Sequence, residues 1–262
     1  MVAVKKKEIR SCPYCGKPYI EKTFIKDATG KFASYLREKY GKNGAVLYVA
    51  DCSCENKAYE LEQRQREMKQ KIEALNKRFD NSLMSPFFRS KKFENLEECE
   101  HKQFCYDYAM SFNPETSFGI QFIGEVGTGK TTLLAAICNK LMERGYSCLF
   151  MTFSGLIESF LTYSAENCGN IQDKLNWLKS YDFVVLDDLG RESYNTERRN
   201  EIAFRIIDEL LNYKIVTCFS ANPEMVSKLK EVWQQSAAVD RLKDMCKHTL
   251  IFKGESRRGK GE

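Results

Sequence analysis

The chain has 262 residues, 43% hydrophobic and 29% charged, with 15 Gly and 5 Pro, a composition that allows a folded core and excludes disordered and fibrous classes. Its longest apolar runs, 45–50 and 133–138, are far shorter than the roughly 20 residues that cross a bilayer, and no secretory signal is visible, so we expect a cytoplasmic protein with no membrane partner. The net charge of +5 is uneven: residues 1–80 hold 18 Lys and Arg against 11 Asp and Glu, which leaves −2 for the rest and suits either an anionic partner or a solvated basic surface.

Two cysteine pairs mark the first part of the chain. Cys12 and Cys15 are two residues apart, Cys52 and Cys54 are one residue apart, and 36 residues separate the pairs. Zn²⁺ favours four thiolates in tetrahedral geometry, and such closed sites stabilise small domains rather than catalyse. We therefore predict a zinc-binding module at residues 1–55.

A helical linker is predicted next, at residues 56–82. The stretch lacks Gly and Pro and is rich in strong helix formers. Its apolar residues Leu61, Met68, Ile72 and Leu75 recur at helical spacing. Because this stripe is thin, the pattern favours a mostly exposed connector or docking helix over a core element.

From residue 83 onward, short apolar runs alternate with helical patterns. The runs lie at 119–123, 148–153, 183–187, 215–220 and 249–252. Buried apolar strands separated by helices indicate a parallel sheet covered on both faces, so we predict a doubly wound α/β domain at residues 83–262. The aromatic pair Phe87 and Phe88, just after Pro86, is expected to pack beside this domain rather than to bind a ligand.

A phosphate-binding motif follows the first of these runs. Residues 124–131, GEVGTGKT, fit G-x-x-x-x-G-K-[ST] between a strand and a helix, where backbone N–H groups and the helix N-terminus can surround phosphate oxygens. Lys130 is expected to reach the β- and γ-phosphates of ATP, and Thr131 to bind Mg²⁺. The predicted ATP-binding residues of this loop are Gly124, Glu125, Val126, Gly127, Thr128, Gly129, Lys130, Thr131 and Thr132.

Carboxylate and amide side chains end two further runs. Asp187 and Asp188 close the run 183–187, and the carboxyl ends of buried parallel strands meet at the edge where nucleotides bind. We assign Asp187 to Mg²⁺ of the bound nucleotide and Asp188 to the attacking water, although such a pair also simply ends strands or caps helices. Asn222 is a candidate for holding that water or contacting the γ-phosphate, although an Asn before Pro223 is also an ordinary turn residue.

These motifs, in this order, resemble the P-loop AAA+ ATPases, and among them the replicative-helicase loaders of bacteria and phages, the DnaC/DnaI type. The likeness covers nearly the whole chain. It comprises the cysteine module, Phe93-Glu94-Asn95-Leu96 after the linker, the GEVGTGKT loop, the DDLG that ends at Gly190, the SAN triplet, Asp240-Arg241-Leu242 and Glu255-Ser256-Arg257-Arg258.

The resemblance implies an ATPase that docks on a hexameric DnaB-type replicative DNA helicase through its N-terminal module. It implies that the protein places the helicase on single-stranded DNA during replication initiation and self-associates through its ATPase domain. Arg241 would be an arginine finger for the ATP of a neighbouring subunit, and Arg258, or equally Arg257, a second sensor of the γ-phosphate. Asp188 stands where many AAA+ proteins have Glu, which suggests slow turnover.

Three other functions fit parts of the sequence. An IstB-like transposition helper ATPase shares the ATPase motifs, but that group generally lacks the cysteine module. A P-loop kinase leaves Asn222, Arg241 and the zinc module without a role. A zinc-bearing adaptor that binds nucleotide without turning it over differs in lacking DNA-stimulated phosphate release.

Overall fold

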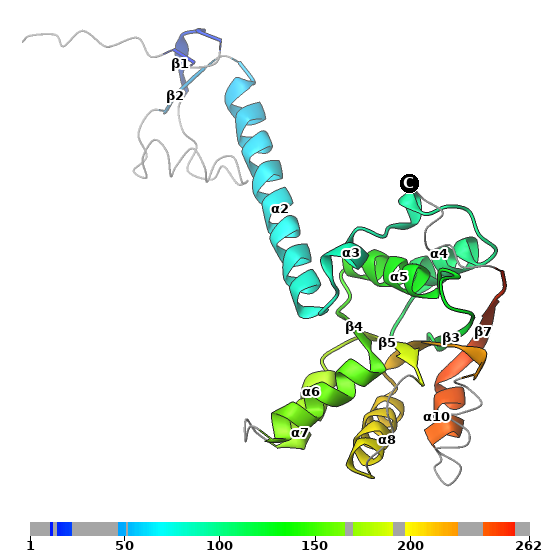
Figure 1. Cartoon of the computed structure of the whole chain (residues 1–262). Helices are drawn as coiled ribbons and strands as arrows, with labels where there is room; N and C mark the ends of the chain where they lie inside the picture. Colours follow the sequence, from blue (N-terminus) through cyan, green and yellow to red (C-terminus); the bar gives the residue numbers. More distant parts are fainter. Residues whose placement is uncertain are drawn as a thin grey trace, which may run out of the picture. The chain divides into compact units, whose positions relative to one another are not determined.

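A computed structural model describes residues 11–12, 15–22, 47–50, 52–165, 170–190, 197–224 and 238–254. The chain divides into two compact units, Met1–Glu73 and Ala74–Glu262 (Figure 1). Within the ranges given above, no helix has both the length and the apolar character needed to span a bilayer.

The first unit contains a two-stranded antiparallel sheet. Strand β1 (Tyr19–Lys22) pairs with β2 (Leu47–Ala50), and Tyr19 lies opposite Ala50. The first cysteine pair precedes β1 and the second pair follows β2. Both pairs therefore lie at the same end of the sheet. This antiparallel pairing explains how cysteines so far apart in sequence come together.

A single long helix, α2 (Cys54–Asn81), covers the segment that we predicted to be helical. Its last turns belong to the second unit, in which Leu75 and Phe79 pack against the core. The rest of the helix carries strong helix formers and no Gly or Pro, so its backbone pattern is uninterrupted.

A five-stranded parallel sheet lies at the centre of the second unit, in the order β4-β5-β6-β3-β7. Its strands are β3 (Gly119–Gly124), β4 (Cys148–Thr152), β5 (Phe183–Leu189), β6 (Val216–Ala221) and β7 (Cys246–Phe252). The first strand of this sheet in chain order, β3, thus lies between β6 and β7. The predicted parallel α/β sheet is confirmed.

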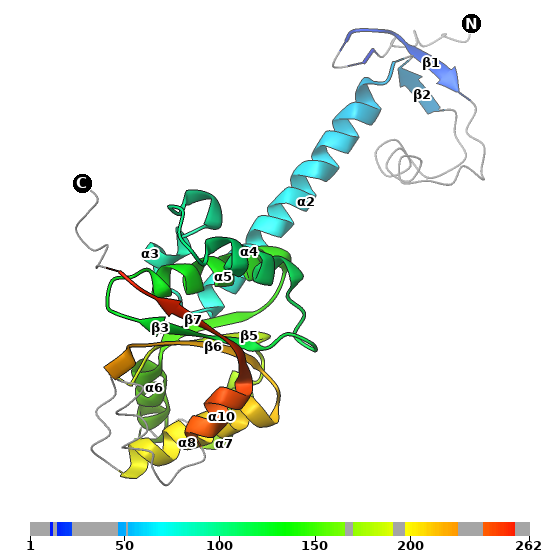
Figure 2. The same cartoon turned by 90° about the vertical axis from the view of Figure 1, so that its right-hand side faces the viewer.

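Helices cover both faces of this sheet (Figures 1 and 2). One face carries α3 (Pro86–Arg89), the 3-10 helix η1 (Phe93–Asn95), α4 (Lys102–Ser111) and α5 (Lys130–Arg144). The other carries α6 (Phe153–Ala165), α7 (Ile171–Leu178), α8 (Glu197–Asn212) and α10 (Ala238–Met245). Along β5, Phe183 and Val185 join the core under the first group, and Val184 and Leu186 the core under the second. This alternation explains the uninterrupted apolar run in the sequence.

Strand β7 begins earlier than predicted, at Cys246 rather than at residue 249. Lys247 and His248 interrupt the apolar run, and both are exposed. Because β7 is an edge strand, it tolerates polar side chains that a central strand does not. A search for continuous apolar runs therefore misses the first half of this strand.

Candidate functional site

The phosphate-binding loop connects β3 to α5 as predicted, and two of its glycines are required by its path. Gly124 ends β3 so close to β7 that an added Cβ would lie 2.3 Å from the carbonyl oxygen of Phe252. Gly129, just before α5, has φ of 98°, a left-handed conformation that side chains disfavour. The start of α5 therefore points its free N–H groups into the loop.

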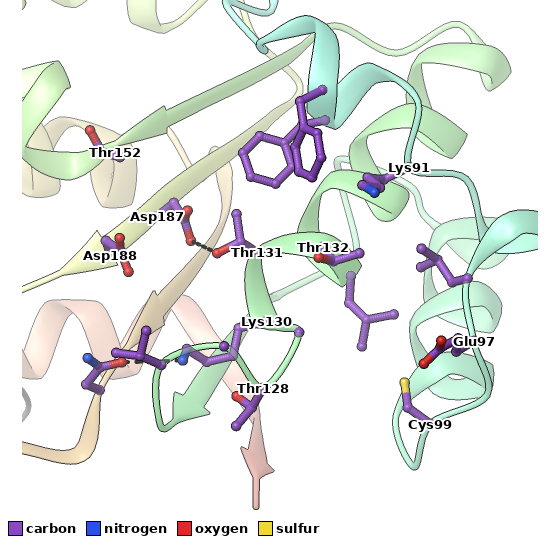
Figure 3. Close-up of a pocket in the computed structure, with 18 of the residues that line it drawn as sticks. Lys91, Glu97, Cys99, Thr128, Lys130, Thr131, Thr132, Thr152, Asp187 and Asp188 are labelled. Atoms are coloured by element: carbon purple, nitrogen blue, oxygen red, sulfur yellow. Dashed lines mark hydrogen bonds between the residues drawn. The ribbon is translucent and has the colours of Figure 1, made fainter. Parts of the chain in front are cut away.

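Lys130 is buried within this loop (Figure 3). Its ammonium donates to the carbonyl oxygens of Gly124 and Glu125, both at 2.7 Å, and to Oδ1 of Asn222 at 3.3 Å. The last contact ties the end of β6 to the loop. A phosphate oxygen is a more strongly charged acceptor than a carbonyl, so a nucleotide bound here can draw the ammonium away from these partners.

Asp187 is a buried carboxylate at the carboxyl end of β5. Its Oδ1 accepts from Thr131 Oγ1 at 3.1 Å, drawn in Figure 3, and from Ser220 Oγ at 2.5 Å. Burial raises the pKa of Asp187 and the charge of Asp188 raises it further, whereas the two hydroxyl donors lower it. Carboxylate and hydroxyl oxygens are ligands that Mg²⁺ takes, so this pair of oxygens fits the metal of a nucleotide.

Asp188 adopts a backbone conformation that the sequence did not reveal. Its φ is 53°, in the left-handed region, and the pairing of β5 with β6 is irregular between Leu186 and Leu189. The Asp188 N–H donates to Ser220 Oγ at 2.9 Å. Neighbouring side chains on a regular strand point to opposite faces, but this irregularity lets both carboxylates line one cavity.

That cavity has a volume of about 650 Å³, within the usual range for ligand sites. One end is lined by the loop residues Val126 to Leu133, together with Thr152, Asp187, Asp188 and Asn222. The other end is lined by Phe87, Phe88, Lys91, Asn95, Leu96, Glu97 and Cys99. Figure 3 shows Lys91 and Glu97 on the side of Thr131 away from the two aspartates. A polar phosphate end and a partly aromatic end suit a nucleotide.

The aromatic end of the cavity carries no sequence motif, and we had expected Phe87 and Phe88 only to pack beside the domain. Phe88 does pack on Phe150, with ring centroids 5.5 Å apart, but both phenylalanines also line the cavity. The amide of Asn139 on α5 donates to the carbonyl oxygens of Phe88, at 2.9 Å, and Lys91, at 2.6 Å. These two bonds fix the aromatic wall to the helix that begins at the phosphate loop.

The raised pKa of Asp187 yields a prediction for stability. Replacing Asp187 by Asn removes a buried charge that Asp188 repels, so the free energy of unfolding should rise at neutral pH. A carboxyl whose pKa is raised by folding costs stability above that pKa and not below the unfolded value. The advantage of the variant should therefore shrink as the pH falls through the folded pKa. Urea unfolding without nucleotide, at neutral and acidic pH, measures both effects.

Asp107→Asn, on α4, is the matched control, because Asp107 is exposed and its carboxylate accepts from Gln103 on the helix surface. It should leave the free energy of unfolding unchanged. An Asp187→Asn protein that is less stable than the wild type at neutral pH would contradict this account of the site.

Comparison with known proteins agrees with this geometry. A sequence model described as "IstB-like ATP binding protein" matches residues 58–262. The chain belongs to the IstB-like ATP-binding family. One relative, the replicative helicase loader DnaC of Escherichia coli K12, is 30% identical over 207 residues, which are 76% of this chain and 80% of that protein. The predicted resemblance to the DnaC/DnaI type is thereby confirmed. Membership of this ATP-binding family also supports the predicted ATPase activity.

Solved structures place this IstB-like protein in the AAA+ P-loop fold. A crystal structure of the DnaC helicase loader superposes with a TM-score of 0.56 at 21% identity, over 64% of this chain and 100% of that one. AMPPCP-bound DnaA from Aquifex aeolicus gives 0.54 at 22% identity, over 66% of this chain and 52% of that one. The predicted AAA+ fold is confirmed.

The predicted arginines of this IstB-like protein lie away from the cavity or outside the described residues. Arg241, on α10, forms an ion pair with Asp208 of α8 at 2.8 Å, and its guanidinium lies 4.6 Å from the ring centroid of Phe204. It does not line the cavity of its own chain. Arg257 and Arg258 are outside the residues that the structure describes.

The four predicted cysteine ligands come together in the first unit. The sulfur atoms of Cys12, Cys15, Cys52 and Cys54 all lie within 4.8 Å of one another. Thiolates around a tetrahedral Zn²⁺, with Zn–S of about 2.3 Å, lie about 3.8 Å apart. Two backbone bonds brace the turn that carries Cys12 and Cys15: Cys12 N–H donates to the Lys17 carbonyl, and Gly16 N–H donates to the Cys12 carbonyl. A bond from the Lys17 backbone lowers the pKa of Cys15 to about 7, so Cys15 forms a thiolate readily, whereas the Cys15 side chain raises the pKa of Cys54. This donor set fits zinc.

Proposed function

We propose that this protein is an ATP-dependent loader that binds a hexameric replicative DNA helicase and places it on single-stranded DNA. The proposal is carried by the convergence of Lys130, Thr131, Asp187 and Asp188 on one cavity, in a chain that aligns with 80% of a helicase loader. In this proposal residues 1–55 dock on the helicase, residues 56–82 connect, and residues 83–262 form the ATPase.

The roles of the site residues follow from their positions. Lys130 binds the β- and γ-phosphates, and the N–H groups of the loop and of the first turn of α5 bind the remaining phosphate oxygens. Thr131 and Asp187 hold Mg²⁺, which when bound offsets phosphate charge. Asp188 and Asn222 both line the cavity, where Asp188 would orient the attacking water and Asn222 would hold that water or contact the γ-phosphate.

Hydrolysis is expected to be slow and to depend on partners. Asp188 has one methylene fewer than Glu and is held by its backbone bond to Ser220, so it reaches less far towards a water molecule. Such a site suits a timed switch whose turnover releases the helicase. The ATPase domain is expected to self-associate, because the resemblance to AAA+ loaders implies that Arg241 of a neighbouring subunit acts at the site.

Arg241 is the residue that we expect to reach the ATP of a neighbouring subunit. Guanidinium groups stabilise the charge of a transferred phosphoryl group, and Arg241 lies outside its own cavity. Replacing Arg241 by Ala should keep ATP affinity while lowering hydrolysis about a thousandfold or more. Mixing this variant with Lys130→Ala should restore part of the activity, because the second protein lends Arg241 to the intact loop of the first. Phosphate release measures both results.

Arg241 could instead act only by joining α10 to α8 through its ion pair with Asp208. In that case breaking the ion pair would lower hydrolysis as much as removing Arg241. Asp208→Asn is therefore the matched control: it releases the guanidinium without removing it and should leave hydrolysis intact. If mixtures of the two inactive proteins regain no activity, Arg241 does not act between subunits.

The helicase itself provides the test of the proposed function. The purified, zinc-loaded protein is mixed with the replicative helicase from the same source and ATP, and light scattering gives the mass of the complex. Loading is read from the unwinding of a forked DNA coated with single-strand binding protein. We expect a complex of defined mass and unwinding that requires the loader.

Other results would assign another function. Assembly on duplex DNA without helicase binding would indicate an IstB-like transposition helper. A phosphorylated nucleoside product in place of free phosphate would indicate a kinase. Tight ATP binding with no phosphate release, with or without DNA, would indicate an adaptor.

A further inference from the structure

Helix α2 exposes an apolar row on its first-unit part. Leu61, Met68 and Ile72 are 57%, 61% and 52% exposed, unusually high for large apolar side chains. With Gln65 they occupy the a and d positions of a seven-residue repeat, Leu61 and Met68 at d, Gln65 and Ile72 at a. We call these four residues the α2 seam. At 1.5 Å per residue it is about 17 Å long.

The α2 seam has the shape of a helix-binding surface. A shallow, open groove of about 540 Å³ follows its part from Gln65 to Ile72, lined by Arg64, Gln65, Met68, Lys69, Ile72 and Glu73. Covering these apolar side chains with an apolar partner removes them from water, which is favourable. Their spacing of three and four residues matches the spacing of apolar side chains along one face of a second helix.

The charges beside the seam are asymmetric. Lys57, Arg64 and Lys71 are spaced seven residues apart along one flank, so that flank is uniformly basic. The other flank is mixed: it carries Glu62 and Lys69, and Lys69 lies 3.9 Å from Glu73. A helix that packs on the seam meets a row of positive charge on one side only.

We propose that the α2 seam binds an amphipathic α-helix of another protein whose facing flank is acidic. Apolar side chains of that helix cover Leu61, Met68 and Ile72, and its carboxylates lie along Lys57, Arg64 and Lys71. The polar amide of Gln65, in the middle of the seam, favours a polar residue opposite and so fixes the register.

A second copy of this chain fits the seam less well. An antiparallel pair sets the basic flank of one copy against the basic flank of the other. A parallel pair sets Arg64 of one copy against Lys69 of the other, and this repulsion offsets the attraction between Lys57 and Glu62. A second copy therefore gains no net attraction from these flanks, whereas an acidic helix can pair with Lys57, Arg64 and Lys71 together, so the charge pattern favours a different, acidic partner. The proposal does not depend on the identity of that partner.

Synthetic peptides test the proposal directly. The probe is an amphipathic helix about three heptads long, with Leu and Ile at a and d and Glu on both flanks. Its twin carries Lys on the flanks. Fluorescence anisotropy with the zinc-loaded full chain should detect binding of the Glu peptide and much weaker binding of the Lys peptide. The difference should shrink at high salt.

Variants locate the binding on the seam. Met68→Glu buries an unpaired carboxylate under the peptide and should weaken binding of the Glu peptide about tenfold or more. Gln70→Glu adds the same charge about 200° around the helix and should leave binding unchanged. Both positions are exposed, so neither change should disturb folding. The double variant Arg64→Glu, Lys71→Glu should reverse the preference towards the Lys peptide.

Three results would overturn the proposal. They are equal affinity for the two peptides, no measurable binding of the Glu peptide, and binding that Met68→Glu does not weaken. Sedimentation of the chain alone gives a fourth: self-association that Met68→Glu abolishes would show that a second copy covers the seam.

Discussion

Replacing Lys130 by Ala should abolish ATP hydrolysis and weaken ATP binding about a hundredfold or more, because a single charged donor inside the loop is lost. The ammonium already lies within 2.7 Å of two carbonyl oxygens of the phosphate loop, so it is the cation nearest to the expected phosphates among the residues that line the loop. Titration calorimetry with ATP and Mg²⁺ measures the affinity, and phosphate release measures the rate.

Lys140→Ala is the matched control for this prediction. Lys140 lies on the same helix, but its ammonium pairs with Glu94 and Glu143 on the surface. Its removal should leave ATP binding and hydrolysis near wild-type values. Because Ala at 130 removes one donor from each of two loop carbonyls, of which that of Glu125 still accepts from Thr128 Oγ1, unfolding of both variants should be compared. A folded Lys130→Ala protein that still binds ATP tightly contradicts the site.

Removing zinc should unfold the first unit and leave the second intact. The described part of the first unit has one short two-stranded sheet beside the cysteine cluster, so metal binding is expected to supply much of the folding energy of this unit. Replacing Cys12 by Ser should lower the zinc content from about one per chain to near zero. Limited proteolysis should then cleave the first unit, helicase binding should be lost, and ATP binding should remain.

Cys99→Ser provides the control for zinc content, since Cys99 lies at the cavity in the second unit and outside the cysteine cluster. Zinc content should not change. If the Cys12→Ser protein keeps one zinc per chain, or if both units unfold when zinc is removed, the metal does not act as a staple of the first unit.

The sequence predicted the sheet and the phosphate end of the site because these obey local rules. A run such as 183–187, apolar on both faces, is buried wherever it lies in a parallel sheet. The glycines and Lys130 form a contiguous motif whose geometry is set by the backbone. The edge strand β7 was predicted too short, because half of its side chains face solvent.

Other parts of the site depend on contacts between distant residues. No local pattern shows that Asp188 takes a left-handed conformation, since its bond to Ser220 joins two strands. The aromatic wall is similar: Phe87 reaches the cavity because Asn139, some 50 residues away, holds the backbone of Phe88 and Lys91. Arg241 and the cysteine ligands remain predictions about function, although the cysteines meet as expected.

A crystal structure with Mg²⁺ and a non-hydrolysable ATP analogue tests the central claim most directly. The account predicts a single nucleotide in the cavity, with Lys130 moved from the carbonyls of Gly124 and Glu125 to the β- and γ-phosphates. It predicts the metal between Thr131 and Asp187, with Asp188 facing the γ-phosphate. A nucleotide bound elsewhere, or a metal that contacts neither Thr131 nor Asp187, would contradict it.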